Sequence, residues 1–237
     1  MSISPSSESL SCGPPKSLSP LSHSFKTSKT SSAPYRLNTG LCDEDRRWSA
    51  ILTVTDTPPW SQSKPQICPS LTKYKKDSTN PEVYKQVFLE ITSRHPKYVQ
   101  VYTDGSKVDE KVAVAAVSSV APNSPFSCRL RDHCSVYTAE LQAVLFALKQ
   151  VYWSKEKKFM IFSELLSALQ ALKNFKTDHP LLIQIQEVLH KINADKKEAI
   201  FMWVPGHIGI RGNEAAGRAA KEVLNTEPTA GLVLFPT

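Results

Sequence analysis

Three carboxylates stand where predicted strands end and predicted helices begin. Asp104 ends a strand in YTDGSK, Glu140 lies in the first turn of a helix in YTAELQAVLFAL, and Glu164 follows a strand in FSELLSALQAL. Side chains at such positions can converge at one edge of a sheet. Clustered acids there are unfavourable unless a cation or hydrogen-bond donors neutralise them. Each motif alone is typical of a turn or a helix start, so their combination carries the argument.

A fourth segment completes the set. In WVPGHIGIRGNEAAGRAAKE, Trp203 closes a strand, Pro205 and Gly206 turn the chain, and His207 follows on a loop that contains glycine. Asn213 is expected to cap the helix that comes next. A lone loop histidine is usually solvated, but this one joins three acids. The sequence therefore predicts one site built from Asp104, Glu140, Glu164 and His207.

The elements that must position these residues form an α/β domain. Alternating or apolar runs predict five strands, at about 98–103, 111–120, 125–130, 157–162 and 199–204. We expect turns at Asp104–Gly105 and at Pro122–Asn123, which gives an antiparallel meander. Helical spacing predicts helices that begin at Thr138, after Ser163, at Asp178–Pro180 and at Asn213. The order β-β-β-α-β-α-α-β-α predicts a mixed five-stranded sheet with helices packed on it.

The chain divides into four parts by composition. Residues 1–55 are rich in Ser and Pro and are expected to be a disordered tail. Residues 56–95 form a connector with one short helix, which starts at Asn80–Pro81. The α/β domain covers residues 96–226, and residues 227–237 form a C-terminal tail.

Charge and cysteine usage narrow the function classes. The net charge of +7 suits a polyanionic partner, although many basic proteins bind no nucleic acid. The five cysteines are scattered, which argues against a disulfide framework and makes Cys128 and Cys134 ordinary free thiols. No apolar run approaches the roughly 20 residues of a membrane span. The start of the chain does not resemble a signal peptide, so we expect a soluble intracellular protein, in either the nucleus or the cytoplasm.

The four motifs resemble the type I ribonuclease H domain that follows the reverse transcriptase in many non-LTR retrotransposons. The family pattern of TDGS, a TAEL-type helix start, TDS and WVPGHSGIxGNExAD is similar to the four segments quoted above, over about residues 96–226. The resemblance implies the ribonuclease H-like fold. It also implies endonucleolytic hydrolysis of the RNA strand of an RNA–DNA hybrid by a two-metal mechanism.

The resemblance also assigns roles to residues. Carboxylates of the family hold two Mg²⁺ ions about 3.5–4 Å apart, and Mn²⁺ is an alternative ion. Asp104 would bridge both ions, Glu140 and Glu164 would hold the second, and His207 would help proton transfer or product release. The hybrid is the implied partner. Candidate phosphate contacts are Lys107, Lys173, Lys176 and Arg211.

Two of the four acidic positions depart from the pattern. Glu164 replaces an aspartate, and a carboxylate displaced by about 1 Å can cost on the order of 10²-fold in rate. Gly217 stands where the last acid of GNExAD belongs, and Glu214, almost one turn earlier, is a poor substitute. Two functions stay open: a ribonuclease of lowered activity, and an inactive nucleic-acid-binding domain derived from a mobile element. A third hypothesis is a relic with a new protein partner.

Overall fold

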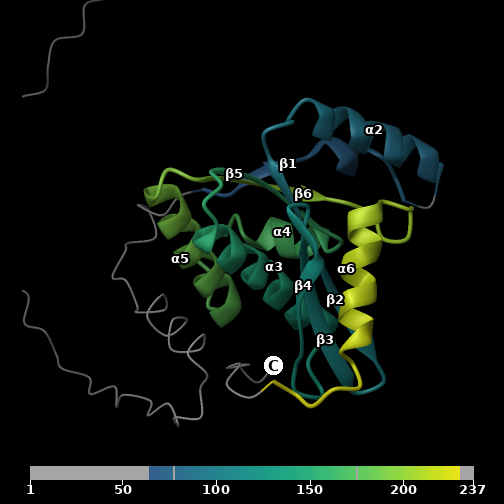
Figure 1. Cartoon of the computed structure of the whole chain (residues 1–237), viewed down its shortest axis with the longest axis vertical. Coiled ribbons are helices and arrows are strands. Elements are labelled where there is room, and N and C mark those ends of the chain that lie inside the picture. Colours follow the sequence, from purple (N-terminus) through teal and green to yellow (C-terminus); the bar gives the residue numbers. More distant parts are fainter. Residues whose placement is uncertain (1–63, 77, 175, 230–237) are drawn as a thin grey trace, which may run out of the picture. The chain divides into compact units, whose positions relative to one another are not determined.

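Six strands form one mixed sheet in the order β1-β6-β5-β2-β3-β4 (Figure 1). The computed structural model describes residues 64–229 except residues 77 and 175, so the predictions for residues 1–55 lie outside the described residues. The strands are β1 Gln66–Cys68, β2 Val99–Val108, β3 Lys111–Ser118, β4 Ala121–Arg129, β5 Lys158–Ser163 and β6 Glu198–Trp203. The predicted mixed sheet with flanking helices is confirmed, and β1 adds a sixth strand that the sequence does not predict.

The antiparallel meander of β2, β3 and β4 is present, but its predicted turns are wrong. Asp104 and Gly105 lie inside β2, where they pair with Ala115 and Val114 of β3. Pro122 and Asn123 likewise lie inside β4. The chain reverses instead around Asp109, whose φ of 53° is left-handed. Pairing along the long β2–β3 ladder overrides the local turn preference of Asp-Gly.

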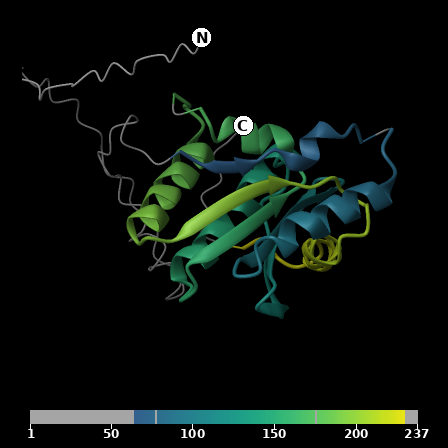
Figure 2. The same cartoon turned by 90° about the horizontal axis from the view of Figure 1, so that it is seen from above.

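Helices cover both faces of the sheet. One face packs against α3 Val136–Trp153, α4 Leu166–Ala171 and α5 Pro180–Ala194. The other face packs against α2 Pro81–Ser93 and α6 Arg211–Glu222, which lie on the same side of the strands (Figure 2). A short 3₁₀ helix, η2 Ser70–Lys73, joins β1 to the chain before α2. Apolar residues on the inner faces of these helices make two cores, one on each side of the sheet.

The helix starts differ in detail from the predicted ones. Ser135, and not Thr138, caps α3, because its hydroxyl accepts a hydrogen bond from the Thr138 N–H at 3.0 Å. Helix α6 begins at Arg211, two residues before the predicted cap Asn213. The predicted start of α2 is confirmed, since Asn80 accepts from the Glu82 N–H at 2.9 Å and Pro81 is the first helical residue.

The apolar helices of this fold belong to the two cores. Helix α3 has 18 residues and is almost wholly buried, as expected for a helix packed between a sheet and α5. Within residues 64–229, without 77 and 175, no helix has both the length and the apolar character needed to cross a bilayer.

Candidate functional site

A pocket of about 350 Å³ opens where β2, α3, the end of β5 and α6 meet. The four predicted site residues all line this pocket, so segments far apart in the sequence come together there. The lining residues are Asp104, Gly105, Ser106, Lys107, Val136, Glu140, Glu164, His207, Asn213, Glu214, Gly217, Arg218 and Lys221.

Gly105 allows β2 to approach the start of α3. A Cβ atom on Gly105 would lie 2.7 Å from the backbone nitrogen of Glu140, which is closer than such atoms normally come. The Gly105 N–H also donates a hydrogen bond to the Glu140 carboxylate. Glycine at this position therefore permits the close approach of β2 to α3, and the TDGS motif has a structural reason beyond its acid.

Burial opposes the ionisation of both acids. It raises the pKa of Glu140 to about 8, and the charges of Asp104 and Glu164 add to this effect. Burial also raises the pKa of Asp104 to about 6, together with the charge of Glu164 and, less, that of Glu214, while Lys221 and His207 act in the opposite direction. Raised carboxyl pKa values in one pocket are typical of a functional site.

The Glu140 side chain is only 5% exposed, and its Oε2 atom has no hydrogen-bond partner among the described residues. A buried carboxylate oxygen without a partner is unfavourable by itself. A cation in the pocket would satisfy it, because hard oxygen ligands are the ones that Mg²⁺ prefers.

The longer side chain of Glu164 turns toward the loop between β6 and α6. Its Oε1 atom accepts a hydrogen bond from Asn213 Nδ2 at 2.6 Å. A Cβ atom on Gly206 would overlap the same carboxylate, so Gly206 leaves room for it. Trp203 Nε1 donates to the Glu164 carbonyl oxygen at 2.8 Å and holds the backbone there. The extra methylene of Glu164 thus places its carboxylate on α6 and its preceding loop.

Gly217 lies on the face of α6 that is turned to Asp104. A Cβ atom at this position would be 3.8 Å from Asp104 Cγ and 3.9 Å from each of its carboxylate oxygens, in ordinary van der Waals contact. A short acidic side chain could therefore fit at position 217, next to Asp104. Gly217 itself brings no side-chain oxygen to the pocket.

His207 lies at the rim of the pocket on a loop of unusual backbone geometry. Its side chain is exposed, and its φ of 62° is left-handed. The neighbouring Ile208 and Ile210 are buried, with 8% and 5% exposed, and they anchor the loop in the second core.

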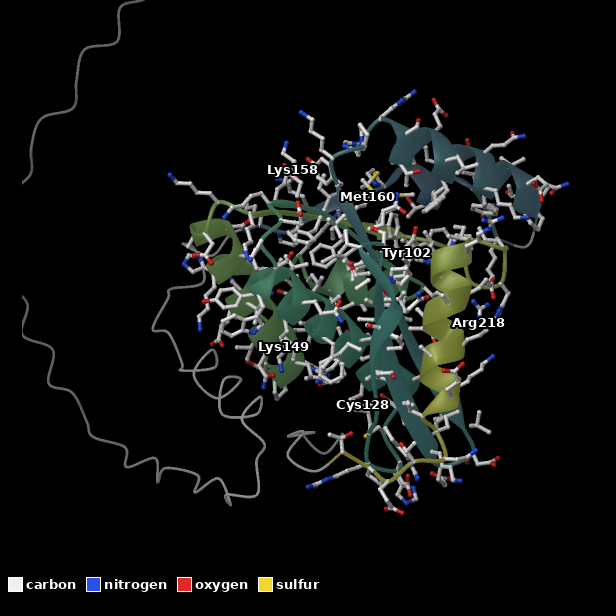
Figure 3. The ribbon with its side chains drawn as sticks, in the orientation of Figure 1. Tyr102, Cys128, Lys149, Lys158, Met160 and Arg218 are labelled. Atoms are coloured by element: carbon white, nitrogen blue, oxygen red, sulfur yellow. The ribbon has the colours of Figure 1, made fainter. Side chains whose placement is uncertain are left out.

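Basic side chains surround the acids. Of the four candidate phosphate contacts, Lys107 lines the pocket, whereas Lys173, Lys176 and Arg211 do not. Sequence reasoning missed Arg218 and Lys221, which line the pocket from the exposed side of α6; Figure 3 labels Arg218 on that helix. Their spacing on α6, at four and seven residues after Glu214, was the signal that could have found them, because such residues share a helix face.

The acidic side chains line one pocket, but their carboxylate groups do not converge on one position. Among the described residues, no three Asp, Glu, His or Cys side chains lie close enough together to hold a metal ion as they stand. The orientation of Glu164 toward Asn213 is one reason, and the absence of an acid at position 217 is another. Asp104, Glu140 and Glu164 nevertheless bring carboxylate oxygens, the ligands that Mg²⁺ prefers, to one pocket.

Comparison with protein families agrees with this arrangement. A family model described as RNase H matches residues 96–225, which is more than half of the chain. The chain belongs to the ribonuclease H family. Membership supports ribonuclease activity on RNA–DNA hybrids in general, and divalent metals are the usual cofactors of this family. The matched region contains the whole acidic pocket, from Asp104 to Lys221.

The three cysteines that the structure describes do not line this ribonuclease H site. Cys68, Cys128 and Cys134 are free thiols, as predicted for Cys128 and Cys134. Burial raises the pKa of Cys128 to about 12, which keeps that thiol protonated and unreactive.

Proposed function

We propose that this chain is an RNA–DNA hybrid ribonuclease that hydrolyses the RNA strand internally, with activity lowered by Glu164 and Gly217. The observation that carries the proposal is the shared pocket of Asp104, Glu140, Glu164 and His207, residues that come from four separate segments. A Cβ atom at position 217 would lie 3.8 Å from Asp104 Cγ, which supports the assignment of this position as the lost fourth acid.

We propose Mg²⁺ as the natural cofactor, with Mn²⁺ as a substitute. Asp104, Glu140 and Glu164 would hold the ion, and the unpartnered Oε2 atom of Glu140 supports this assignment. When bound, the ion supplies Lewis-acid stabilisation of negative charge on the phosphate. The missing carboxylate at position 217 removes one ligand of the first ion of the family pattern, which would keep only the bridging Asp104.

The remaining pocket residues act on substrate and protons. Lys107, Arg218 and Lys221 would bind backbone phosphates of the hybrid, whose RNA strand is distinguished from DNA by its 2′-hydroxyl groups. The imidazole of His207, exposed at the rim, would hold or pass on a proton at the leaving or attacking oxygen.

The second candidate is an inactive hybrid-binding domain of mobile-element origin, which Gly217 favours. The motif resemblance to retrotransposon-encoded domains supports that origin under either function. In the second case the pocket would bind the hybrid through its basic rim and leave the RNA intact.

Cleavage of a labelled hybrid decides between the two candidates. Wild-type protein and the Asp104→Asn variant are purified identically and assayed with Mg²⁺ and with Mn²⁺. We expect slow RNA cleavage by the wild type and none by the variant. Binding of the hybrid with equal, trace cleavage in both preparations would contradict the ribonuclease and leave the binding domain. Failure to bind the hybrid would contradict both candidates.

A further inference from the structure

The segment from β1 to α2 lies before the region matched by the family model, yet it packs against the loop that carries His207. The match begins at residue 96. Strand β1 nevertheless pairs in parallel with β6, in a register that joins Gln66 to Ile200 and Cys68 to Met202. The chain then passes through η2 to α2, which covers the same face of the sheet as α6. This segment is therefore built into the sheet and its second core.

The apolar face of α2 shares its core with the end of β6 and the following loop. Tyr84, Phe88 and Ile91 are the buried residues of α2. The Phe88 ring lies 5.2 Å from the ring of Phe162, and the Tyr84 ring lies 6.4 Å from that of Trp203. Three residues next to His207 belong to the same core: Val204, Ile208 and Ile210.

A direct contact joins α2 to the tip of this loop. A Cβ atom on Gly209 would lie 2.9 Å from Lys85 Cε and 3.1 Å from Lys85 Nζ. The end of the Lys85 side chain, Cε and Nζ, therefore lies beside Gly209, two residues after His207. Lys85 Nζ is held in turn by Glu82 Oε1 at 2.6 Å.

The loop needs such support because its backbone is strained. His207 has a left-handed φ of 62°, whereas the φ of 81° at Gly209 costs little because glycine has no Cβ atom. A left-handed conformation costs roughly 1–2 kcal/mol for a residue with a Cβ atom. Such conformations persist where the surrounding packing determines them.

We propose that α2 positions the His207 loop, residues 204–210, so that the working site of this chain includes a segment outside the region matched to ribonuclease H. Phe88 acts by packing the core that it shares with Val204, Ile208 and Ile210, and Lys85 acts by lying beside Gly209. Any effect of α2 on cleavage rests on the proposed function. The positioning of the loop by α2 is independent of that function.

Hydrogen exchange of the full-length chain tests the proposal without metal or substrate. In Lys85→Ala we expect amide exchange in residues 204–212 to quicken by about tenfold or more, with α3 and α5 unchanged. Lys85→Met keeps the stem and should leave exchange near that of the wild type. In the NMR spectrum, the imidazole signals of His207 should broaden or shift in the alanine variant only.

Phe88→Ala should act in the same direction and more strongly, since it removes a buried ring. Leu89→Ala is its matched control, because Leu89 is adjacent on α2 and 62% exposed. Val188→Ala opens the opposite core and separates general destabilisation from a local effect. If Phe88→Ala fails to fold, the comparison of Lys85→Ala with Lys85→Met still tests the proposal.

Equal exchange of residues 204–212 in Lys85→Ala, Lys85→Met and wild type would overturn the proposal, as would an equal effect of Leu89→Ala. Neither result bears on whether the chain cuts RNA. If cleavage is measurable, loss of the α2 contact should lower kcat with little change in KM. A change confined to KM would argue for a substrate contact instead.

Discussion

Asn213 holds the carboxylate of Glu164 on α6, through a hydrogen bond of 2.6 Å from Nδ2 to Oε1. The two residues are 49 positions apart in the chain. This bond uses one lone pair of Oε1 and fixes the direction of the carboxylate, while Oε2 makes no hydrogen bond with the described residues that would occupy it. The longer acid is thus tied to α6, while its charge still acts on Asp104 and Glu140 in the same pocket.

Restoring both acidic positions should restore cleavage. Gly217→Asp adds a carboxylate beside Asp104, and Glu164→Asp removes the reach to Asn213. We expect the double variant to cut the hybrid at least about 10²-fold faster than the wild type, with each single change giving much less. Gly217→Asp should not destabilise α6, since Asp is a better helix former than Gly. Rates are measured by single-turnover cleavage of a labelled hybrid.

Asp104→Asn in the restored protein is the control, and it should abolish the gain. A double variant that folds and binds the hybrid but cuts no faster would show that residue 164 or 217 is assigned to the wrong place in the family pattern.

Metal titration should report one ion in the wild type and two in Gly217→Asp. Glu214 lines the same pocket as Asp104, so it can supply part of the missing charge. Glu214→Gln should therefore weaken binding about tenfold in the wild type and much less in Gly217→Asp. Calorimetry with Mg²⁺ and electron paramagnetic resonance with Mn²⁺ measure the number of ions. Two tight sites in the wild type would contradict the loss of a ligand.

Stability without metal should fall as the pH rises. Burial is the main cause of the raised pKa values of Glu140, about 8, and Asp104, about 6. Because these values lie above those of the unfolded chain, about 4, the neutral forms stabilise the fold at acid pH and that contribution is lost as the pH rises from about 4 to about 8. Added Mg²⁺ should offset the loss, and more so at higher pH.

The comparison of Glu140→Gln with the wild type isolates this effect in calorimetric melting curves. The variant should gain stability relative to the wild type between about pH 5 and about pH 8 in the absence of metal. Glu222→Gln, at an exposed carboxylate on α6, should show no such trend. A constant difference between Glu140→Gln and wild type across this range would contradict the burial argument.

Hybrid binding should depend on salt through the basic rim of the pocket. Lys221→Ala and Arg218→Ala should each weaken binding and reduce the slope of log K against log salt by about 1. Lys158→Ala is the control, because Lys158 does not line the pocket and lies over the ring of Tyr98. Fluorescence anisotropy with a labelled hybrid and with the matching DNA duplex measures the affinity and its salt dependence. Equal affinity for the two duplexes would exclude recognition of the hybrid.

Much of the site could be predicted because its motifs are local. The segments that carry Asp104, Glu140, Glu164 and His207 each pair a recognisable strand or helix boundary with one polar side chain. The gap at Gly217 is visible for the same reason. The reach of Glu164 to Asn213 was not predictable, since it depends on where α6 sits relative to β5.

In the fold too, the elements that depend on local sequence were predicted, and those that depend on distant pairing were not. Periodicity identified α3, α5 and α6 and the five longer strands. Strand β1 has three residues and no periodicity, and it forms because β6 offers it a free edge. The Asp104–Gly105 pair misled in the opposite way: a local turn preference yielded to eight consecutive pairings between β2 and β3.

Gly206 couples the effect of a substitution at position 206 to the residue at position 164. A side chain at this position would collide with the carboxylate of Glu164, but the shorter reach of an aspartate would vacate that space. Gly206→Ala would therefore force the Glu164 carboxylate to leave this space, whereas the same change beside an aspartate at 164 would meet no such atom. The two positions are expected to form an epistatic pair, in which the effect of one substitution depends on the residue at the other.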